Sequence, residues 1–492
     1  MASTLGLAGI EAIMFRTIGD GPSAWELLLP PEVLRLPAEL ARVDALLDDP
    51  AFFAPFAPFF HPVLGRPSTP AGCCLRLMFL KFRCRLGYES LCAEVSDSIS
   101  WRRFCRIPLD AKVPHPAALM KLTTRCGSTA VAGLNEALLA RAAESKLLRA
   151  SRLRADTTVV PADVSYPTGS GLLARAIRGI AAAGRRIQAA GGASRTRVRD
   201  RSRAAGRRAH AIAAKLRSRA AQARDGKQAV VARMTGELAS LAVQAAADAG
   251  PLLANARQAL RRAQAKAAAL AASGVRDAAA GRPRGRLRRA AAALAGLVTA
   301  TRQIAAQARQ RLAGTMPDGA TRRVSLHDAD ARPVAKGRLG KPVEFGYKAQ
   351  VTDNDDGIIL DHVLEQGNPA DGPQLAPAIG RVIRRAGSKP RTVTAGRSYG
   401  EQSIEDDLHD LGIRHVVIPR KGKPGKARQA AEHRPAFRRA IKWRTGSEGR
   451  ISTLKRQYGR ARTRLDGTEG ARTWTGYGVL ACNLVKISAP AT

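Results

Sequence analysis

The sequence predicts a mixed α+β fold, in which a helical N-terminal region precedes a strand-and-helix core that a long basic helical insertion interrupts. Three observations support this prediction. Residues 14–150 show helical periodicity between Pro and Gly breaks, residues 171–310 are rich in Ala and Arg with almost no aromatics, and residues 340–420 alternate short apolar runs with amphipathic segments. A chain of 492 residues can build two or three domains with proper cores.

The N-terminal region is expected to consist of short helices with tight connections. Thr69-Pro70 supplies an N-cap and a first-turn Pro for a helix that continues through residues 74–85. Further helical segments are expected at residues 88–101, 102–106 and 117–122. Short helices with basic and aromatic residues suit a helix-turn-helix-like module. An ordinary helical domain with Trp101 and Phe104 in its core explains the same periodicity equally well.

The middle of the chain carries most of the charge. The whole chain has 81 Lys plus Arg against 40 Asp plus Glu, a net charge of +41, and residues 171–310 contribute 29 bases against 5 acids, or +24. This excess predicts a polyanionic partner, most often nucleic acid. An Arg/Ala-rich coding bias is the alternative, and the uneven placement of the charge argues against it.

The same segment is expected to form antiparallel helices in a hairpin or coiled-coil-like arm. Residues 228–272 have high helix propensity, and Gly250-Pro251 is expected to interrupt them. A helix of roughly 40 residues spans about 60 Å, enough to follow more than one turn of DNA. A solvated basic linker is the alternative, because apolar side chains larger than Ala are sparse.

The core is expected to begin with a strand at residues 153–160 and to resume after the insertion. A hairpin is predicted around the turn Asp353–Gly357. The predicted elements after it are a helix at 374–385, a strand at 391–395, a helix carrying Ile404, Leu408 and Leu411, a strand at 413–418, and helices at 435–460 and 478–487. Without the insertion this order is close to an RNase H-like core.

These elements predict four segments: a helical N-terminal DNA-binding domain at 1–150, the first core strand at 151–173, the basic helical insertion at 174–335, and the remainder of the RNase H-like core at 336–492. Seven Cys without a Cys-x-x-Cys pair favour reduced thiols over a zinc site or a disulfide framework. No apolar run of about 18 residues and no signal-peptide pattern occur, so a cytoplasmic, nucleoid-associated protein without membrane contact is expected.

Two acids stand out as candidate catalytic residues. Cutting and joining phosphodiesters uses two divalent metals about 3.5–4 Å apart, held by carboxylates that converge from separate elements. Asp156 on the first strand and Glu448 on a late helix fit that requirement. Arg444 and Lys455, four residues before and seven after Glu448, would share its helix face and contact phosphates. Taken alone, either acid is more often a solvated surface residue.

Several segments together resemble the DDE transposases of bacterial insertion sequences. They are Gly65-Arg-Pro-Ser-Thr69, Leu86-Gly-Tyr-Glu-Ser-Leu91, Val113-Pro-His-Pro116, Arg154-Ala-Asp-Thr-Thr-Val-Val160 with Tyr166-Pro-Thr168, Phe345-Gly-Tyr-Lys348, Arg444-Thr-Gly-Ser-Glu-Gly-Arg450 with Lys455, and Leu480–Lys486. The resemblance implies DNA transposition with Mg²⁺ or Mn²⁺ in a two-metal site, and Asp156 and Glu448 as catalytic metal ligands. It implies DNA contacts by Arg444, Lys455, Arg450 and Lys348. It also implies double-stranded DNA, both transposon ends and target, as the partner of a homodimer, and no small-molecule substrate.

One position departs from that family. A second catalytic Asp there closes the strand before a Gly-Tyr-Gly-like turn, and this chain has Gly396 at that place in Val393-Thr-Ala-Gly-Arg-Ser-Tyr-Gly400. Glu401 and Asp361 are the candidate substitutes. The hypothesis is a copy that keeps DNA binding while strand cleavage is weak or absent. The alternatives are an active enzyme, a non-catalytic DNA-binding relative that represses or competes with active copies, and a general nucleic-acid-coating protein.

Overall fold

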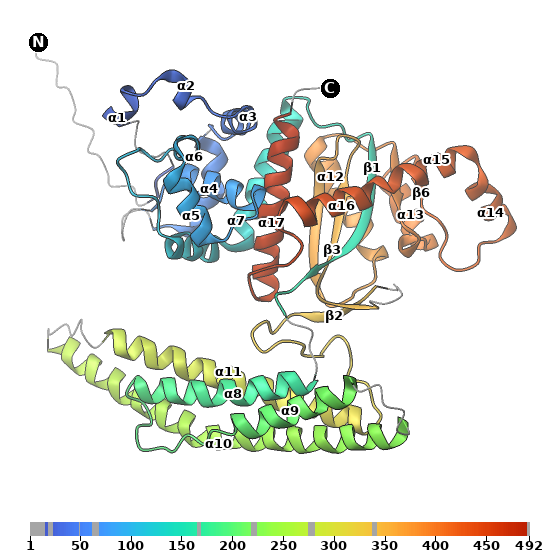
Figure 1. Ribbon diagram of the computed structural model, residues 1–492. Helices are drawn as coiled ribbons and strands as arrows, with labels where there is room; N and C mark the ends of the chain where they lie inside the picture. Colours follow the sequence, from blue (N-terminus) through green and yellow to red (C-terminus); the bar gives the residue numbers. More distant parts are fainter. Residues whose placement is uncertain are drawn as a thin grey trace, which may run out of the picture. The chain divides into compact units, whose positions relative to one another are not determined.

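The computed structural model describes residues 15–17, 23–48, 50–61, 68–164, 169–217, 224–273, 281–336 and 342–489. The chain divides into two compact units (Figure 1). Unit 1 comprises residues 1–163 and 338–492, and unit 2 comprises residues 164–337. The predicted N-terminal domain of residues 1–150 therefore shares a unit with the sheet. Residues 65–67 and 166–168, which contribute to the family resemblance, lie outside the described residues.

A mixed sheet organises unit 1; its strands β3, β1, β5 and β6 lie side by side in that order, and β4 pairs with β3. Strand β1 pairs antiparallel with β3 on one side and parallel with β5 on the other. The bounds are β1 Arg152–Pro161, β3 Val343–Asp353, β4 Ile359–Gln366, β5 Thr392–Ala395 and β6 His415–Val417. The predicted hairpin is present as β3 and β4, and the element order expected of an RNase H-like core is confirmed.

Unit 1 also contains helices before, among and after these strands. N-terminal to the sheet they are α1 Ala24–Leu27, α2 Pro31–Leu34, α3 Ala38–Leu46, α4 Ala71–Arg83, α5 Tyr88–Asp97, α6 Ile99–Phe104 and α7 Pro116–Glu144. Among and after the strands they are α12 Leu375–Ala386, α13 Gln402–Asp410, α14 Lys426–His433, α15 Pro435–Arg444, α16 Gly446–Gln457 and α17 Gly467–Ile487, with 3-10 turns at Pro50–Phe59, Gly372–Gln374 and Arg397–Tyr399. Trp101 packs against the hydrophobic core and Phe104 lies within it, and the same core continues into β1 and α17.

Three helix boundaries differ from the sequence prediction. Helix α4 begins after Pro70, which serves as its N-cap in place of Thr69. Helix α17 begins at Gly467, eleven residues before the predicted start, because its buried face continues to Ala471. The single helix predicted over 435–460 is divided into α15 and α16 at Thr445. There Gly446 lies so close to the Arg154 guanidinium that no Cβ would fit without displacing it.

Unit 2 is a helical body with a core of its own. Its helices are α8 Gly169–Ala189, α9 Ser202–Arg217, α10 Arg224–Ala272 and α11 Gly281–Leu312, and the short strand β2 Arg332–Ala335 follows. Ala and Leu side chains from these helices form a separate buried cluster. The solvated-linker alternative is therefore wrong for the described part of this segment. Helix α10 continues through Gly250-Pro251, because the neighbouring Ala249 and Leu252 are buried in the cluster and offset the lost backbone hydrogen bond.

Candidate active site

Strand pairing places the first predicted carboxylate beside the glycine. The parallel register of β1 and β5 ends at Ala155 opposite Ala395, so the next residues along the two strands are Asp156 and Gly396. The backbone of Gly396 is extended, with φ −74° and ψ 168°, a conformation open to any residue. A side chain at this position would therefore lie next to Asp156, where the second family carboxylate is expected.

Arg444 lies between the predicted metal ligands. As the last residue of α15, it places its Nη1 atom 3.0 Å from Asp156 Oδ2 and its Nη2 atom 3.8 Å from Glu448 Oε1. A Cβ on Gly396 would lie 3.8 Å from the same Nη1 atom. The structure thus brings Asp156, Gly396 and Glu448 around one guanidinium, which neutralises part of the charge of the two carboxylates.

The two carboxylates experience different environments. Burial raises the pKa of Asp156 above its usual value, while Arg444 and the Thr157 backbone N–H lower it and Glu448 raises it. Glu448 is 68% exposed in the first turn of α16, where the helix dipole favours a negative charge. The candidate site therefore contains one largely buried acid, Asp156, and one exposed acid, Glu448.

These residues do not fit a two-metal site. Such a site requires converging oxygen ligands, and Gly396 offers no side-chain oxygen where the second Asp is expected. The guanidinium of Arg444 lies where a cation would balance Asp156 and Glu448. Within the described ranges, no three His, Cys, Asp or Glu side chains lie together as a possible metal site.

The other predicted DNA contacts are distributed differently. Lys348 on β3 is 15% exposed, with its Nζ atom 2.5 Å from Asp371 Oδ1, and it also donates to Pro369 O. Arg450 on α16 is directed toward Asp353, 3.5 Å away. Both cations are thus engaged inside unit 1 rather than presented to a ligand. Lys455 lies two turns beyond Glu448 on α16 and lines a basic hollow.

Neither candidate substitute for the second Asp is available as a metal ligand beside Asp156, because each carboxylate is paired with a basic residue. Glu401 caps α13 and pairs with Lys421 at 2.6 Å. Asp361 lies on β4, two strands from β1, which corresponds to about 10 Å. Its carboxylate is 3% exposed and is held by Arg381 and Arg385.

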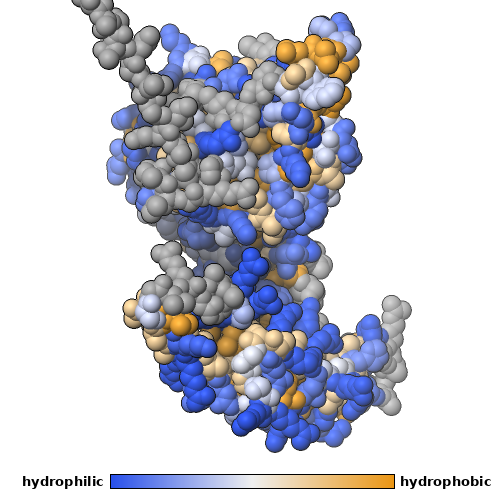
Figure 2. Space-filling model, turned by 90° about the vertical axis from the view of Figure 1, so that its left-hand side faces the viewer, coloured by the Kyte–Doolittle hydropathy of each residue, from blue (hydrophilic) through white to orange (hydrophobic). Residues whose placement is uncertain are grey.

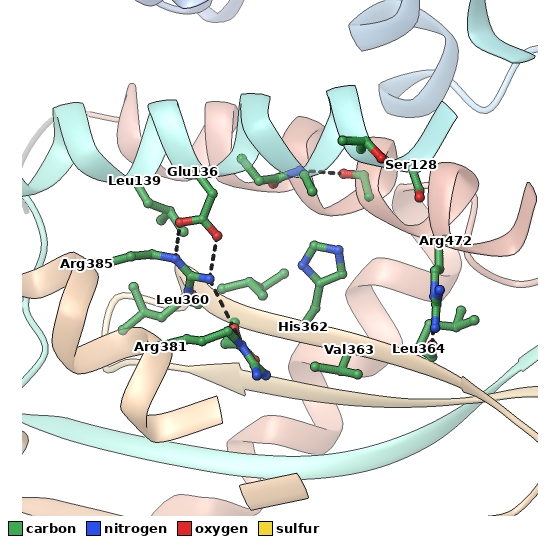
Figure 3. A pocket seen from close by; sticks show the side chains of 16 residues that line it. Ser128, Glu136, Leu139, Leu360, His362, Val363, Leu364, Arg381, Arg385 and Arg472 are labelled. Atoms are coloured by element: carbon green, nitrogen blue, oxygen red, sulfur yellow. Dashed lines mark hydrogen bonds and ion pairs between the residues drawn. The ribbon is translucent and has the colours of Figure 1, made fainter. Parts of the chain in front are cut away.

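Asp361 lines a cavity of about 440 Å³ bounded by α7, β4, α12 and α17, and Figure 3 shows its neighbours His362, Arg381 and Arg385 in that cavity. Glu136 of α7 binds Arg385 from the opposite side. His362 in the same cavity has its pKa lowered to about 4, mainly by burial and then by Arg460. The acids Asp361 and Glu136 neutralise Arg381 and Arg385 within the cavity, so Asp361 has a local structural role.

A buried polar network that sequence patterns did not predict supports the candidate site. Arg154, two residues before Asp156, is buried and pairs with the buried Asp353 at 2.8 Å. Arg154 also donates to Trp443 O, and Ser447 Oγ donates to Asp353. This network joins β1 and β3 to α15 and α16, and it thereby holds Arg444 and Glu448 against the strand that carries Asp156. The signal in the sequence is Arg154 between the apolar residues Leu153 and Ala155 of the predicted strand.

Two family models match the chain. Residues 32–125 match the family described as Transposase domain (DUF772), and residues 318–484 match the one described as Transposase DDE domain. The second match includes Gly396 and Glu448, whereas β1 and the helices of unit 2 lie outside both matches. No curated protein and no solved structure matched significantly. Among the described residues, no helix is long and apolar enough to cross a membrane. With a transposase domain at each side of the insertion, the chain belongs to the DDE transposases of insertion sequences and its function is DNA transposition.

Proposed function

We propose that this transposase binds transposon-end DNA, and that its metal-dependent strand cleavage and transfer are weak or absent. The observation that carries the proposal is that Gly396 and Asp156 are the residues next after the last pair of the β1–β5 ladder, Ala155 with Ala395. Arg444 lies between Asp156 and Glu448, the two acids that remain. Mg²⁺ or Mn²⁺ would have to displace that guanidinium and bind without the bridging carboxylate.

DNA binding is supported by the charge of the chain. Residues 171–310 hold 29 bases and only 5 acids, so most of their cations have no possible acidic partner within the segment. Arginines of this segment pair with Asp200, Glu237 and Asp248, and the segment as a whole keeps a net charge of +24. Hydrophilic side chains dominate the visible surface of unit 2 (Figure 2). Such a surface binds the phosphate backbone without reading sequence.

The helices near the N-terminus are the proposed sequence-reading part, since they match the transposase domain of residues 32–125. Assembly as a homodimer on DNA is part of the proposal, because transposition joins two ends. An alternative is a fully active enzyme, but Glu401 and Asp361 are committed to other partners. A protein that merely coats nucleic acid would show no preference for the ends of its own element.

The test measures binding and cleavage on the same DNA. The protein is titrated onto a labelled duplex containing the terminal inverted repeat of its element and onto a shuffled duplex of equal length. We expect tighter binding to the repeat, and little nicking with Mg²⁺ or Mn²⁺. Rapid metal-dependent cleavage at the end by the unaltered protein would refute the proposed loss of activity. Equal binding to both duplexes would leave only the coating function.

A further inference from the structure

A second cationic site lies in unit 1, in a hollow of about 490 Å³ between α4, α16 and the start of α17. Six basic side chains line it, and none of its lining residues is acidic: Lys81, Arg85, Lys455, Arg456, Arg462 and Arg464. The bases come from segments more than 350 residues apart in sequence, so the fold itself gathers them. A concentration of one charge in a concave surface favours a bound ion of opposite sign.

Lys81 is the buried cation of this hollow. It is 3% exposed, and its Nζ atom lies 4.3 Å from the ring centre of Trp474 and 4.6 Å from that of Tyr88. Nζ also donates to Leu86 O at 3.2 Å. The pKa of Lys81 is lowered to about 8, first by burial and then by Arg464. No carboxylate forms an ion pair with Lys81 in the part of the chain that the structure describes.

This arrangement is costly for the protein alone. Removing an ammonium group from water is unfavourable unless an anion compensates it, and ring contacts return only part of that cost. The exposed Arg85, Arg456 and Arg464 add like charge around it. Of the arginines in the hollow, Arg462 pairs with Asp163 at 3.1 Å, outside the lining. A bound anion would therefore relieve both the burial of Lys81 and the mutual repulsion.

We propose that this hollow binds a backbone phosphate of the DNA on which the transposase acts. The proposal rests on the DNA binding proposed above and names a contact point for it. Lys455 and Glu448 lie seven residues apart on α16, which corresponds to about 10 Å along the helix. That distance equals about three base steps of one strand. A phosphate held here would fix the DNA near Asp156 and Glu448 and would join α4 to α16.

The experiment measures DNA affinity against salt for four proteins: the unaltered chain, Lys81→Met, Arg464→Ala and Arg414→Ala. Met conserves the length of the Lys side chain without its charge. Arg414 is a matched control, since it is an exposed arginine of unit 1 just before β6. We expect Lys81→Met and Arg464→Ala each to lower affinity about tenfold and to reduce the slope of log K against log salt by about 1. Arg414→Ala should stay within about twofold of the unaltered chain.

A second measurement separates DNA phosphate from a free phosphate compound. Thermal unfolding is followed in sodium phosphate and in sodium chloride at equal ionic strength. If Lys81→Met loses a phosphate-specific stabilisation but binds DNA with an unchanged slope, the hollow serves a small phosphate compound and the DNA assignment is overturned. If the unaltered chain binds DNA and no hollow variant changes the slope, this inference fails while the proposed function stands.

Failure of the unaltered chain to bind DNA would overturn both the proposed function and the phosphate site proposed here. Should Lys81→Met not unfold cooperatively, the exposed Arg464→Ala and Arg456→Ala decide by the same slope, because neither side chain is part of the core.

Discussion

Substitution of Gly396 by Asp tests whether the candidate site lacks its second carboxylate at this position. The backbone there is extended, and the atoms nearest to a new Cβ are Arg444 Nη1 at 3.8 Å and Ser398 Oγ at 3.9 Å. These are ordinary van der Waals distances, so the side chain fits without displacing the backbone. The substitution would supply a third carboxylate beside Asp156 and Glu448.

The electrostatic magnitude follows from this geometry. A unit charge about 4 Å from a guanidinium gains about 4 kcal/mol at an effective dielectric constant of 20. Arg444 already forms ion pairs with Asp156 and Glu448, and the site is partly exposed to solvent. The net electrostatic stabilisation from a new Asp is therefore about 1 kcal/mol or less. Gly396→Asp should therefore fold with near-unaltered stability when no metal is added.

Metal dependence is the decisive readout. We expect Mn²⁺ to stabilise Gly396→Asp by about 2.7 kcal/mol at a hundred times its dissociation constant. This stabilisation corresponds to a rise of roughly 5 °C in the unfolding temperature. Gly396→Asn is the matched control, since it has the same shape without the charge, and it should show no such shift. End nicking measured in parallel should appear only in Gly396→Asp. Equal responses of the Asp and Asn variants to Mn²⁺ would refute this placement of the second carboxylate.

Three further predictions concern the same surroundings. Arg444→Gln should raise the pKa of Asp156 further, because the guanidinium lowers it. When the pKa of Asp156 is higher in the folded than in the unfolded state, its protonation stabilises the fold at low pH, and this stabilisation is lost as the pH rises. Denaturant titrations should therefore show the variant losing stability relative to the unaltered chain between about pH 4 and pH 7. Asp353→Ala should lower the free energy of unfolding by about 3 kcal/mol, because it removes the buried carboxylate that pairs with Arg154. The control Asp355→Ala removes a half-exposed partner of Arg152 and should cost less than about 1 kcal/mol. Equal costs would contradict the structural role of the Arg154–Asp353 pair. Gly400→Ala should destabilise the protein by about 2 kcal/mol, because its Cβ would overlap the backbone carbonyl of Pro419. Thermal unfolding checks this against Gly425→Ala, where a Cβ would meet no other atom.

Local patterns predicted much of unit 1. The β3–β4 hairpin has its turn residues at the expected place, and helix α13 ends before Gly412, whose φ is 87°. The pattern failed where distant residues decide the outcome. At the break after Thr445, Gly446 packs against the side chain of Arg154, almost 300 residues away in sequence.

The candidate site shows the same division. Sequence resemblance selected Asp156, Gly396 and Glu448, and strand pairing places the first two side by side. The buried pairings of Lys348 with Asp371 and of Arg450 with Asp353 could not be read from the chain, because each joins separate elements. A basic residue near a family motif looks the same in sequence whether it faces solvent or a buried acid.

The position of unit 2 within the chain also affects how the sheet forms. Asp156 pairs with Val351, and Pro161 pairs with Gly346, so the first ladder of the sheet must close across the whole insertion. Loop closure becomes less costly by about 2 kcal/mol for each tenfold shortening of the free loop. The helices of unit 2 have their own core, so they can form first and thereby shorten the free loop between β1 and β3. An insertion that folds independently thus allows the sheet to assemble almost as if the two strands were neighbours in the chain.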